Sequence, residues 1–173
     1  FETLLWVHGT LHFVVIASFF RFAYLEGAVT LWLVTAATST GLSAASSAII
    51  TAHELGHKKP KSPGWRLARL LLFSVHYTHF TTEHNHNHHK WVSTNRDPAS
   101  ATEEQGIWIF WVKTIPAQFL SSVRIHNGKG RTGLRNPSYQ GLILQIVALA
   151  VLFIVPGGTP VAIGWLLLSL TAV

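Results

Sequence analysis

Polar and apolar positions divide the chain into an apolar front, a polar middle and an apolar back. Of the twenty Asp, Glu, Lys and Arg residues, three lie in the first 52 positions, twelve lie between Glu54 and Glu104, and none follows Arg135. An uncharged apolar stretch of roughly 20 residues is long enough to cross a bilayer as a helix. The pattern therefore predicts an all-α protein, a polytopic integral membrane helical bundle with a polar segment between its spans.

Four apolar runs carry this prediction. Two lie in front, at about Thr3–Leu25 and Ala28–Ile50, and two lie behind, at Gly141–Val155 and Val161–Val173, with a break at Pro156–Pro160. The second run has no charged residue and many small side chains, which let membrane helices approach closely. A soluble helical protein is the weaker alternative, because uncharged runs of this length are rare in soluble folds.

The composition restricts the chemistry that the chain can support. Among 173 residues, 12% are charged, against about 25% in an ordinary soluble domain. The chain has no Cys and no Met but eleven His, eight of them between His53 and His89. Without thiols, disulfides, iron–sulfur clusters and thiolate metal sites are excluded for these residues. Any metal would be bound by imidazole or oxygen.

Basic residues flank the apolar runs in two clusters, which predict the orientation of the chain. Since membrane proteins carry an excess of Lys and Arg on the cytoplasmic side, both clusters are expected there. The preference for Lys and Arg on the cytoplasmic side thus accounts for the net charge of +6, and the sequence has no nucleic-acid-binding motif. The clusters are Lys58, Lys59, Lys61, Arg66 and Arg69 after the second run, and Lys129, Arg131 and Arg135 before the third.

The first histidine box, His53-Glu54-Leu55-Gly56-His57, ends the second apolar run. Residues four apart share one face of a helix, so both imidazoles can bind one metal ion. Taken alone, the box also matches the HExxH pattern of zinc proteases, in which Glu54 would be the general base. A pair of interfacial histidines at the end of a membrane helix is the alternative without metal.

The second histidine box, Glu83-His84-Asn85-His86-Asn87-His88-His89, places four imidazoles within six residues. Together the boxes offer more imidazoles than one zinc ion needs, which favours a two-metal centre. A solvated His-rich loop is the alternative. Four further side chains are candidates to orient the ligating imidazoles or, for the carboxylates, to bridge metals: Glu54, Glu83, His79 and Asp97.

The connection from Arg66 to Thr82 decides whether the two boxes can meet. Its apolar run, Leu67–Val75, is short and interrupted by Arg69 and Ser74, so the segment is too polar to cross a membrane comfortably. We expect a helix that lies in the interface and returns the second box to the side of the first.

HELGHK (His53–Lys58), EHNHNHH (Glu83–His89) and NRDPAS (Asn95–Ser100) together resemble the membrane alkane 1-monooxygenases. These belong to the membrane histidine-box group with xylene monooxygenases and fatty acid desaturases and hydroxylases. The resemblance implies two non-haem iron ions bound on the cytoplasmic side of a bacterial inner membrane. By the same resemblance the metal ligands are His53, His57, His84, His88 and His89, whereas His86 is not a ligand. Asn87 stands where the family usually has Gly.

The resemblance further implies terminal hydroxylation of medium- or long-chain alkanes by O₂, with electrons from rubredoxin and its reductase. Because the later histidine boxes of the family are missing, residues 1–173 are expected to be one membrane domain of a longer enzyme. Membrane lipid surrounds such a domain, and the basic clusters would suit an acidic electron carrier. Candidate liners of an apolar substrate channel are Trp6, Phe13, Phe19, Phe20, Trp32, Trp108, Phe110 and Trp111.

Three other functions fit parts of the pattern. A desaturase, another hydroxylase or a xylene-type monooxygenase would use the same boxes on a different substrate. A membrane zinc protease would use HELGH and leave the second box idle. A metal transporter would need ionisable residues in the middle of its spans, where they are scarce.

Overall fold

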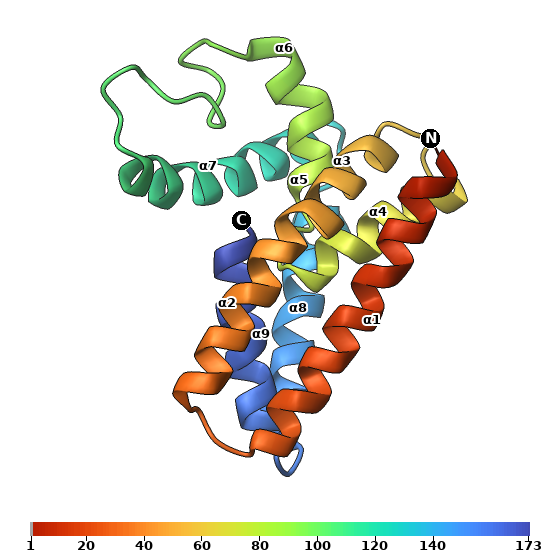
Figure 1. Ribbon diagram of the computed structural model, residues 1–173. Helices are drawn as coiled ribbons and strands as arrows, with labels where there is room; N and C mark the ends of the chain where they lie inside the picture. The colour runs from red at the N-terminus through yellow and green to blue at the C-terminus, as the bar shows by residue number, and fades with distance from the viewer. Residues whose placement is uncertain (1) are drawn as a thin grey trace. The chain divides into compact units, whose positions relative to one another are not determined.

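The computed structural model describes residues 2–173, and in that part every regular element is helical, as predicted (Figure 1). Two short segments are π-helical, with hydrogen bonds from residue i to i+5, and one is a 3₁₀ turn. The elements in chain order are α1 (Glu2–Glu26), α2 (Leu31–Ala44), η1 (π, Ala45–Ile50), α3 (Thr51–Gly56), α4 (Pro63–Ser74), α5 (Phe80–Glu83), η2 (π, His84–His88), α6 (His89–Trp91), α7 (Ile107–Gly128), η3 (3₁₀, Gly133–Arg135), α8 (Pro137–Ile154) and α9 (Gly158–Ala172).

Three helical stretches among the described residues are long and apolar enough to cross a membrane. They are α1, the continuous stretch Leu31–Gly56 made of α2, η1 and α3, and α8. The fourth predicted run forms α9, which has 15 residues and is shorter than a span. The expected break between the two runs is present, but it ends before Gly158. Pro160 is accommodated in the first turn of α9, where its missing N–H costs no hydrogen bond.

The helices group into two compact units. The first contains the chain up to Tyr77 together with Leu144–Val173, and the second contains Thr78–Ile143. Helix α8 begins in the second unit and ends in the first. A single membrane domain stays a prediction.

The first unit is held together by close contact between α2 and α9. A Cβ at Gly41 would overlap the carbonyl oxygen of Leu168 and the side chain of Thr171, so only glycine allows the two backbones this close. Gly41 is thus one small residue of the second apolar run that close helix packing requires.

A buried histidine joins three elements of the first unit. His12 of α1 is 2% exposed, and its Nδ1 and Nε2 lie 2.9 Å and 2.7 Å from the hydroxyls of Ser47 and Ser74. Trp165 Nε1 donates to the carbonyl of Ser74 at 2.6 Å. These bonds satisfy polar groups inside an apolar bundle, where an unpaired group is costly.

The second unit is organised around α7. Asn136 donates to the carbonyl of Val123 and to Asn127 Oδ1, and the hydroxyls of Ser122 and Ser138 lie 2.8 Å apart. The end of α7 is thereby fixed beside the start of α8.

Acidification should weaken the first unit through His76, which lies between α4 and α5, outside the three candidate spans. Its Nδ1 bonds the Ser169 hydroxyl at 2.7 Å, its Nε2 is buried without a hydrogen-bond partner, and its ring lies 4.2 Å from that of Trp165. Burial lowers the pKa of His76 from 6.5 to about 4. Since the folded state then binds fewer protons than the unfolded state, stability is fully present above pH 6.5 and falls as pH drops toward 4.

The substitution His76→Asn should remove the contribution of His76 to this pH dependence, because Asn tolerates the positive φ of 54° at this position and does not titrate. In metal-free protein, the loss of melting temperature between pH 7.5 and 5 should shrink by at least about 2 °C. The exposed His86, replaced by Asn, is the matched control. An unchanged loss in His76→Asn would contradict the prediction.

Candidate metal centre

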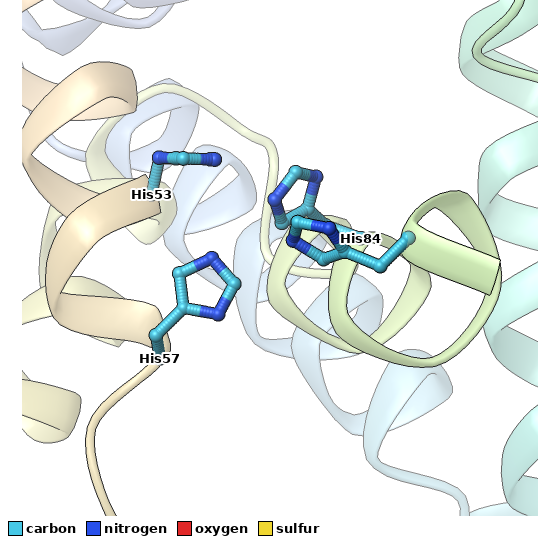
Figure 2. A group of neighbouring side chains, drawn as sticks. His53, His57 and His84 are labelled. Atoms are coloured by element: carbon cyan, nitrogen blue, oxygen red, sulfur yellow. The ribbon is translucent and has the colours of Figure 1, made fainter. Parts of the chain in front are cut away.

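The first box lies at the end of the second span, directly after the π-helical segment η1. His53 lies in α3 and His57 caps its C-terminus, with ring centroids 5.2 Å apart. Figure 2 shows both imidazoles extending from the same side of this helix. The four-residue spacing thus brings the two rings together, as a pair of ligands for one ion requires.

Glu54 contacts the neighbouring histidine of the same box. Its Oε1 lies 3.1 Å from His53 Nδ1, and both side chains are partly exposed. A carboxylate at Nδ1 favours the tautomer that carries the proton there, which leaves Nε2 with a lone pair for a metal.

The second box lies in the second unit, where α5 passes into the π-helical turn η2. The backbone N–H of His89 donates to the carbonyl of His84, five residues earlier. Because a π turn takes more residues than an α turn, positions i+4 and i+5 both return to the side of residue i. His84, which Figure 2 also shows, is therefore joined by both His88 and His89.

The rings of His84, His88 and His89 form a cluster. The centroid of the His84 ring lies 4.4 Å from that of His89 and 5.2 Å from that of His88, and the latter two are 6.0 Å apart. His84 is buried, His88 is half-buried and His89 is exposed. Exposure thus rises across the cluster from His84 to His89.

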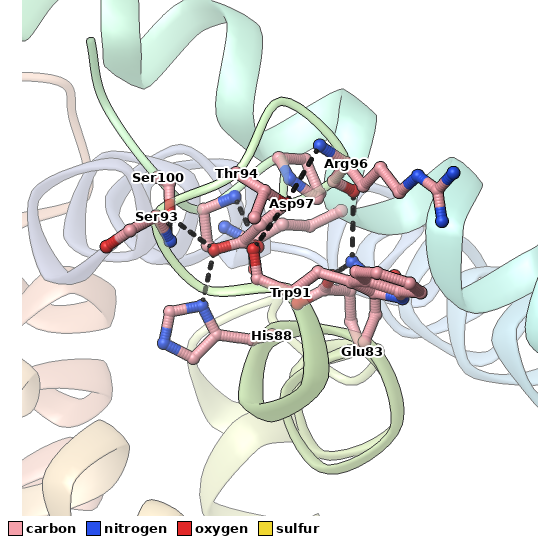
Figure 3. Close-up of polar contacts among 12 residues, drawn as sticks. Glu83, His88, Trp91, Ser93, Thr94, Arg96, Asp97 and Ser100 are labelled. Atoms are coloured by element: carbon pink, nitrogen blue, oxygen red, sulfur yellow. Dashed lines mark hydrogen bonds and ion pairs between the residues drawn. The ribbon is translucent and has the colours of Figure 1, made fainter.

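Asp97 holds one ring of this cluster. Its Oδ2 lies 2.8 Å from His88 Nδ1 and accepts a 2.6 Å hydrogen bond from the Ser100 hydroxyl (Figure 3). Its Oδ1 accepts the backbone N–H of Ala99 at 3.0 Å, and the residue is only 3% exposed. A buried carboxylate at one imidazole nitrogen is the usual companion of a metal at the other.

Glu83 is the second buried carboxyl group beside the cluster, and it is 1% exposed. Burial raises the pKa of Glu83, against the lowering effect of the hydrogen bond that Asn87 Nδ2 donates to its Oε1 at 2.8 Å. Asn87 Nδ2 also lies 3.5 Å from the carbonyl oxygen of Arg96. The residue that replaces the family's glycine thus links the box to the following loop.

His79 and His86, two further histidines near the box, have different surroundings. His79 is 7% exposed and packs edge-on against the ring of Phe119, with centroids 5.5 Å apart. His86 is exposed and its Nδ1 lies 3.1 Å from the carbonyl oxygen of Thr82. The π turn therefore separates His86 from the three clustered rings.

Two contributors were not predicted from the sequence, although each has a local signal. Asn87 lies four residues after Glu83, the spacing at which helical side chains meet. Ser100 lies three residues after Asp97, the spacing at which a side chain of a turn folds back on the first residue.

The donor atoms fit a first-row transition metal without thiolate ligands. His53, His57, His84 and His89 each offer a ring nitrogen, and His88 has its Nδ1 engaged by a carboxylate. Imidazole donors suit zinc, copper, nickel and non-haem iron. The residues present are thus chemically able to hold such a centre.

A helical membrane protein with two boxes of this kind belongs to the class of histidine-box membrane proteins. The sequence model of the fatty acid desaturase family matches residues 27–173, and the chain is a member of that family.

Curated relatives confirm the resemblance to alkane monooxygenases. Alkane 1-monooxygenase 1 of Alcanivorax borkumensis is 40% identical over 111 residues, which cover 61% of this chain and 27% of that protein. The alkane 1-monooxygenases of Ectopseudomonas oleovorans and Pseudomonas putida are 33% and 36% identical, over 70% and 60% of this chain and 32% and 26% of their own lengths. The chain thus spans about a quarter to a third of the relatives it matches.

Proposed function

We propose that this protein is a membrane monooxygenase that hydroxylates the terminal carbon of medium- or long-chain alkanes with O₂, using electrons from rubredoxin. The observation that carries the proposal is the second box, where three imidazole rings lie close together and a buried carboxylate contacts Nδ1 of one of them. The relatives named alkane 1-monooxygenase support the substrate class.

The proposed cofactor is a pair of non-haem iron ions, with His53, His57, His84, His88 and His89 among the ligands. We infer that both boxes serve one centre at the cytoplasmic side of a bacterial inner membrane. In support, the structure describes every residue between the two boxes, and no helix among them is long and apolar enough to cross a membrane. When bound, the metal pair supplies the reduction of O₂ that breaking an unactivated C–H bond requires.

The chain's own residues prepare the ligands for this role. Asp97 at His88 Nδ1 and Glu54 at His53 Nδ1 favour the tautomer with the proton on Nδ1, in which Nε2 carries the lone pair that a metal ligand needs. Glu83 remains buried next to the cluster, where Asn87 fixes one of its oxygens.

An alkane has no polar group to recognise, so its site must be apolar and reached from the lipid. Among the predicted liners, Trp32 and Trp108 are 72% and 77% exposed, which is typical of lipid-facing or interfacial side chains. Phe19 is 4% exposed, and the Phe20 ring packs against Trp165. Phe19 and Phe20 are therefore the better candidates for an apolar passage inside the bundle.

The test is metal analysis of the purified full-length protein, followed by a product assay with an alkane, O₂, rubredoxin and its reductase. Two iron ions per chain and a primary alcohol as the product are expected. One zinc ion, or no alkane oxidation with iron bound, would refute the proposal. Because the chain is a desaturase-family member, an acyl substrate is assayed in parallel, and an unsaturated acyl product would assign the same centre to desaturation.

A further inference from the structure

A pocket of about 470 Å³ lies in the second unit, next to Asn87 of the second box. One wall is a stripe of α7 in which positions 117, 120, 121, 124 and 125 follow the helical period. The opposite wall is formed by Asn87 and by the loop residues Asn95, Arg96 and Pro98. This pocket contains none of the proposed metal ligands.

The pocket is lined by cations and hydrogen-bond donors. Arg96 and Arg124 are both exposed, and within the described residues neither guanidinium has a carboxylate at ion-pair distance. The lining residues include no Asp or Glu. Two carboxyl groups next to lining residues are buried and already hydrogen-bonded. Glu83 accepts from Asn87, and Asp97, which lies between Arg96 and Pro98 in the sequence, accepts from Ser100. The site therefore favours an anion, and arginine suits the oxygens of a phosphate.

The loop wall is tied to the rest of the unit. Thr114 of α7 donates to the carbonyl of Pro98, and Asn87 reaches the carbonyl of Arg96. The Arg96 guanidinium lies over the Trp91 ring, 4.5 Å from its centroid, as Figure 3 shows. A wall fixed in this way loses little conformational entropy when a ligand binds.

Three observations place the pocket at a membrane surface. The hydroxyl of Ser122 in α7 contacts that of Ser138 in the first turn of the candidate span α8. Helix α7 also exposes Trp108 and Val112 by 77% and 66%, and the pocket residue Leu120 by 49%. The Trp91 ring contacts a second cation besides Arg96, since Lys90 Nζ lies 5.0 Å from its centroid. Exposed apolar side chains beside Trp and basic residues are typical of the interface between lipid and water.

We propose that this pocket binds the phosphate of an anionic membrane phospholipid, with Arg96 and Arg124 contacting the phosphate oxygens and Leu120 and Ile125 contacting the glycerol and acyl portion. This inference does not depend on the reaction proposed above. A lipid headgroup is favoured over an acidic protein because the cations line a concave pocket with an apolar wall.

The experiment is native mass spectrometry of the full-length protein from nanodiscs that contain phosphatidylglycerol and phosphatidylcholine. Phosphatidylglycerol should be retained preferentially, and Arg124→Gln and Arg96→Gln should each lower that retention by about tenfold or more, the effect of losing one charge-assisted hydrogen bond. Arg131→Gln is the matched control. Arg131 is exposed and lies seven residues after Arg124 in the chain, but it does not line the pocket. Arg124→Lys keeps the positive charge but loses the planar guanidinium group. Its retention of phosphatidylglycerol should lie between that of the unchanged protein and that of Arg124→Gln. Unchanged melting temperatures show that the variants are folded.

Three results would overturn the proposal. An equal loss in Arg131→Gln would mean diffuse attraction to an anionic surface. Displacement of the lipid by millimolar inorganic phosphate or glycerol 1-phosphate would mean a site for small anions. Binding of a polyglutamate peptide that depends on Arg124, without retention of phosphatidylglycerol, would assign the surface to an acidic protein.

Discussion

Replacing His84 by glutamine is expected to lower both the metal content and the hydroxylation rate of the full-length protein by on the order of 100-fold or more. His84 is the buried member of the second box and the ring to which both His88 and His89 are nearest. Glutamine has a similar size but no imidazole nitrogen, so the change removes a ligand without leaving a large cavity. Losing a ligand costs more than losing one of its hydrogen-bond partners, which typically costs 10–100-fold. Metal analysis and the alcohol product measure the two effects.

His86 provides the matched control in the same box. It is exposed, and its Nδ1 lies near the Thr82 carbonyl rather than in the ring cluster. His86→Gln should therefore change metal content and rate by less than about twofold, as expected for a surface substitution. Equal losses in both variants would mean that the box binds metal as an unstructured His-rich segment, and that outcome would contradict the ligand assignment.

The helices of this protein follow from its sequence because long apolar runs have few alternatives. An uncharged run such as that of α8 must satisfy its own backbone hydrogen bonds in a membrane, and a helix does so. The segment after Arg66 was likewise expected not to cross the membrane, and α4 ends after 12 residues at Ser74. The 15-residue length of α9 was less predictable, because apolar character alone does not fix where a helix begins.

The π-helical turns could not be predicted, although they determine the geometry of the site. A π turn and an α turn differ by one residue in hydrogen-bond register, and the hydrophobic pattern does not encode that difference over five or six residues. In the second box this one residue brings His89 to the side of His84 together with His88. The spacing of four alone would have explained His88 but not His89.

Contacts between distant parts of the sequence were also beyond prediction. His12 is a polar residue within an apolar run, which indicates that it needs a partner but not which one. Its partners Ser47 and Ser74 are 35 and 62 residues away. Asp97, in contrast, was proposed as a partner of the ligands because a carboxylate follows the box closely. Its hydrogen bond to His88 is present.

Replacing Asp97 by asparagine is expected to weaken metal binding by 10–100-fold, through the proton on His88 rather than through misfolding. Asparagine retains an oxygen that can accept the backbone N–H of Ala99, so the turn is preserved. In the native protein, Asp97 Oδ2 accepts hydrogen bonds from His88 Nδ1 and from the Ser100 hydroxyl. In the variant, the amide nitrogen of asparagine would occupy this position and donate instead. His88 would then accept at Nδ1 and carry its proton on Nε2, which blocks that nitrogen as a ligand. A carboxylate-to-amide change beside a catalytic histidine acts in this way in serine proteases.

Ser100→Ala separates this effect from a general loss of the loop structure. It removes one donor to Oδ2 but leaves the carboxylate on His88, so it should cost less than about threefold in metal affinity. Metal affinity is measured by competition with a chelator across pH 6 to 8, together with the melting temperature of the metal-free protein. Weakened affinity at an unchanged melting temperature in Asp97→Asn supports the tautomer argument. Both substitutions disturb the hydrogen bond between Ser100 and Asp97, but only Asp97→Asn removes the carboxylate from His88. If Ser100→Ala weakens metal binding as much as Asp97→Asn does, the structure of the loop, and not the tautomer of His88, would be responsible.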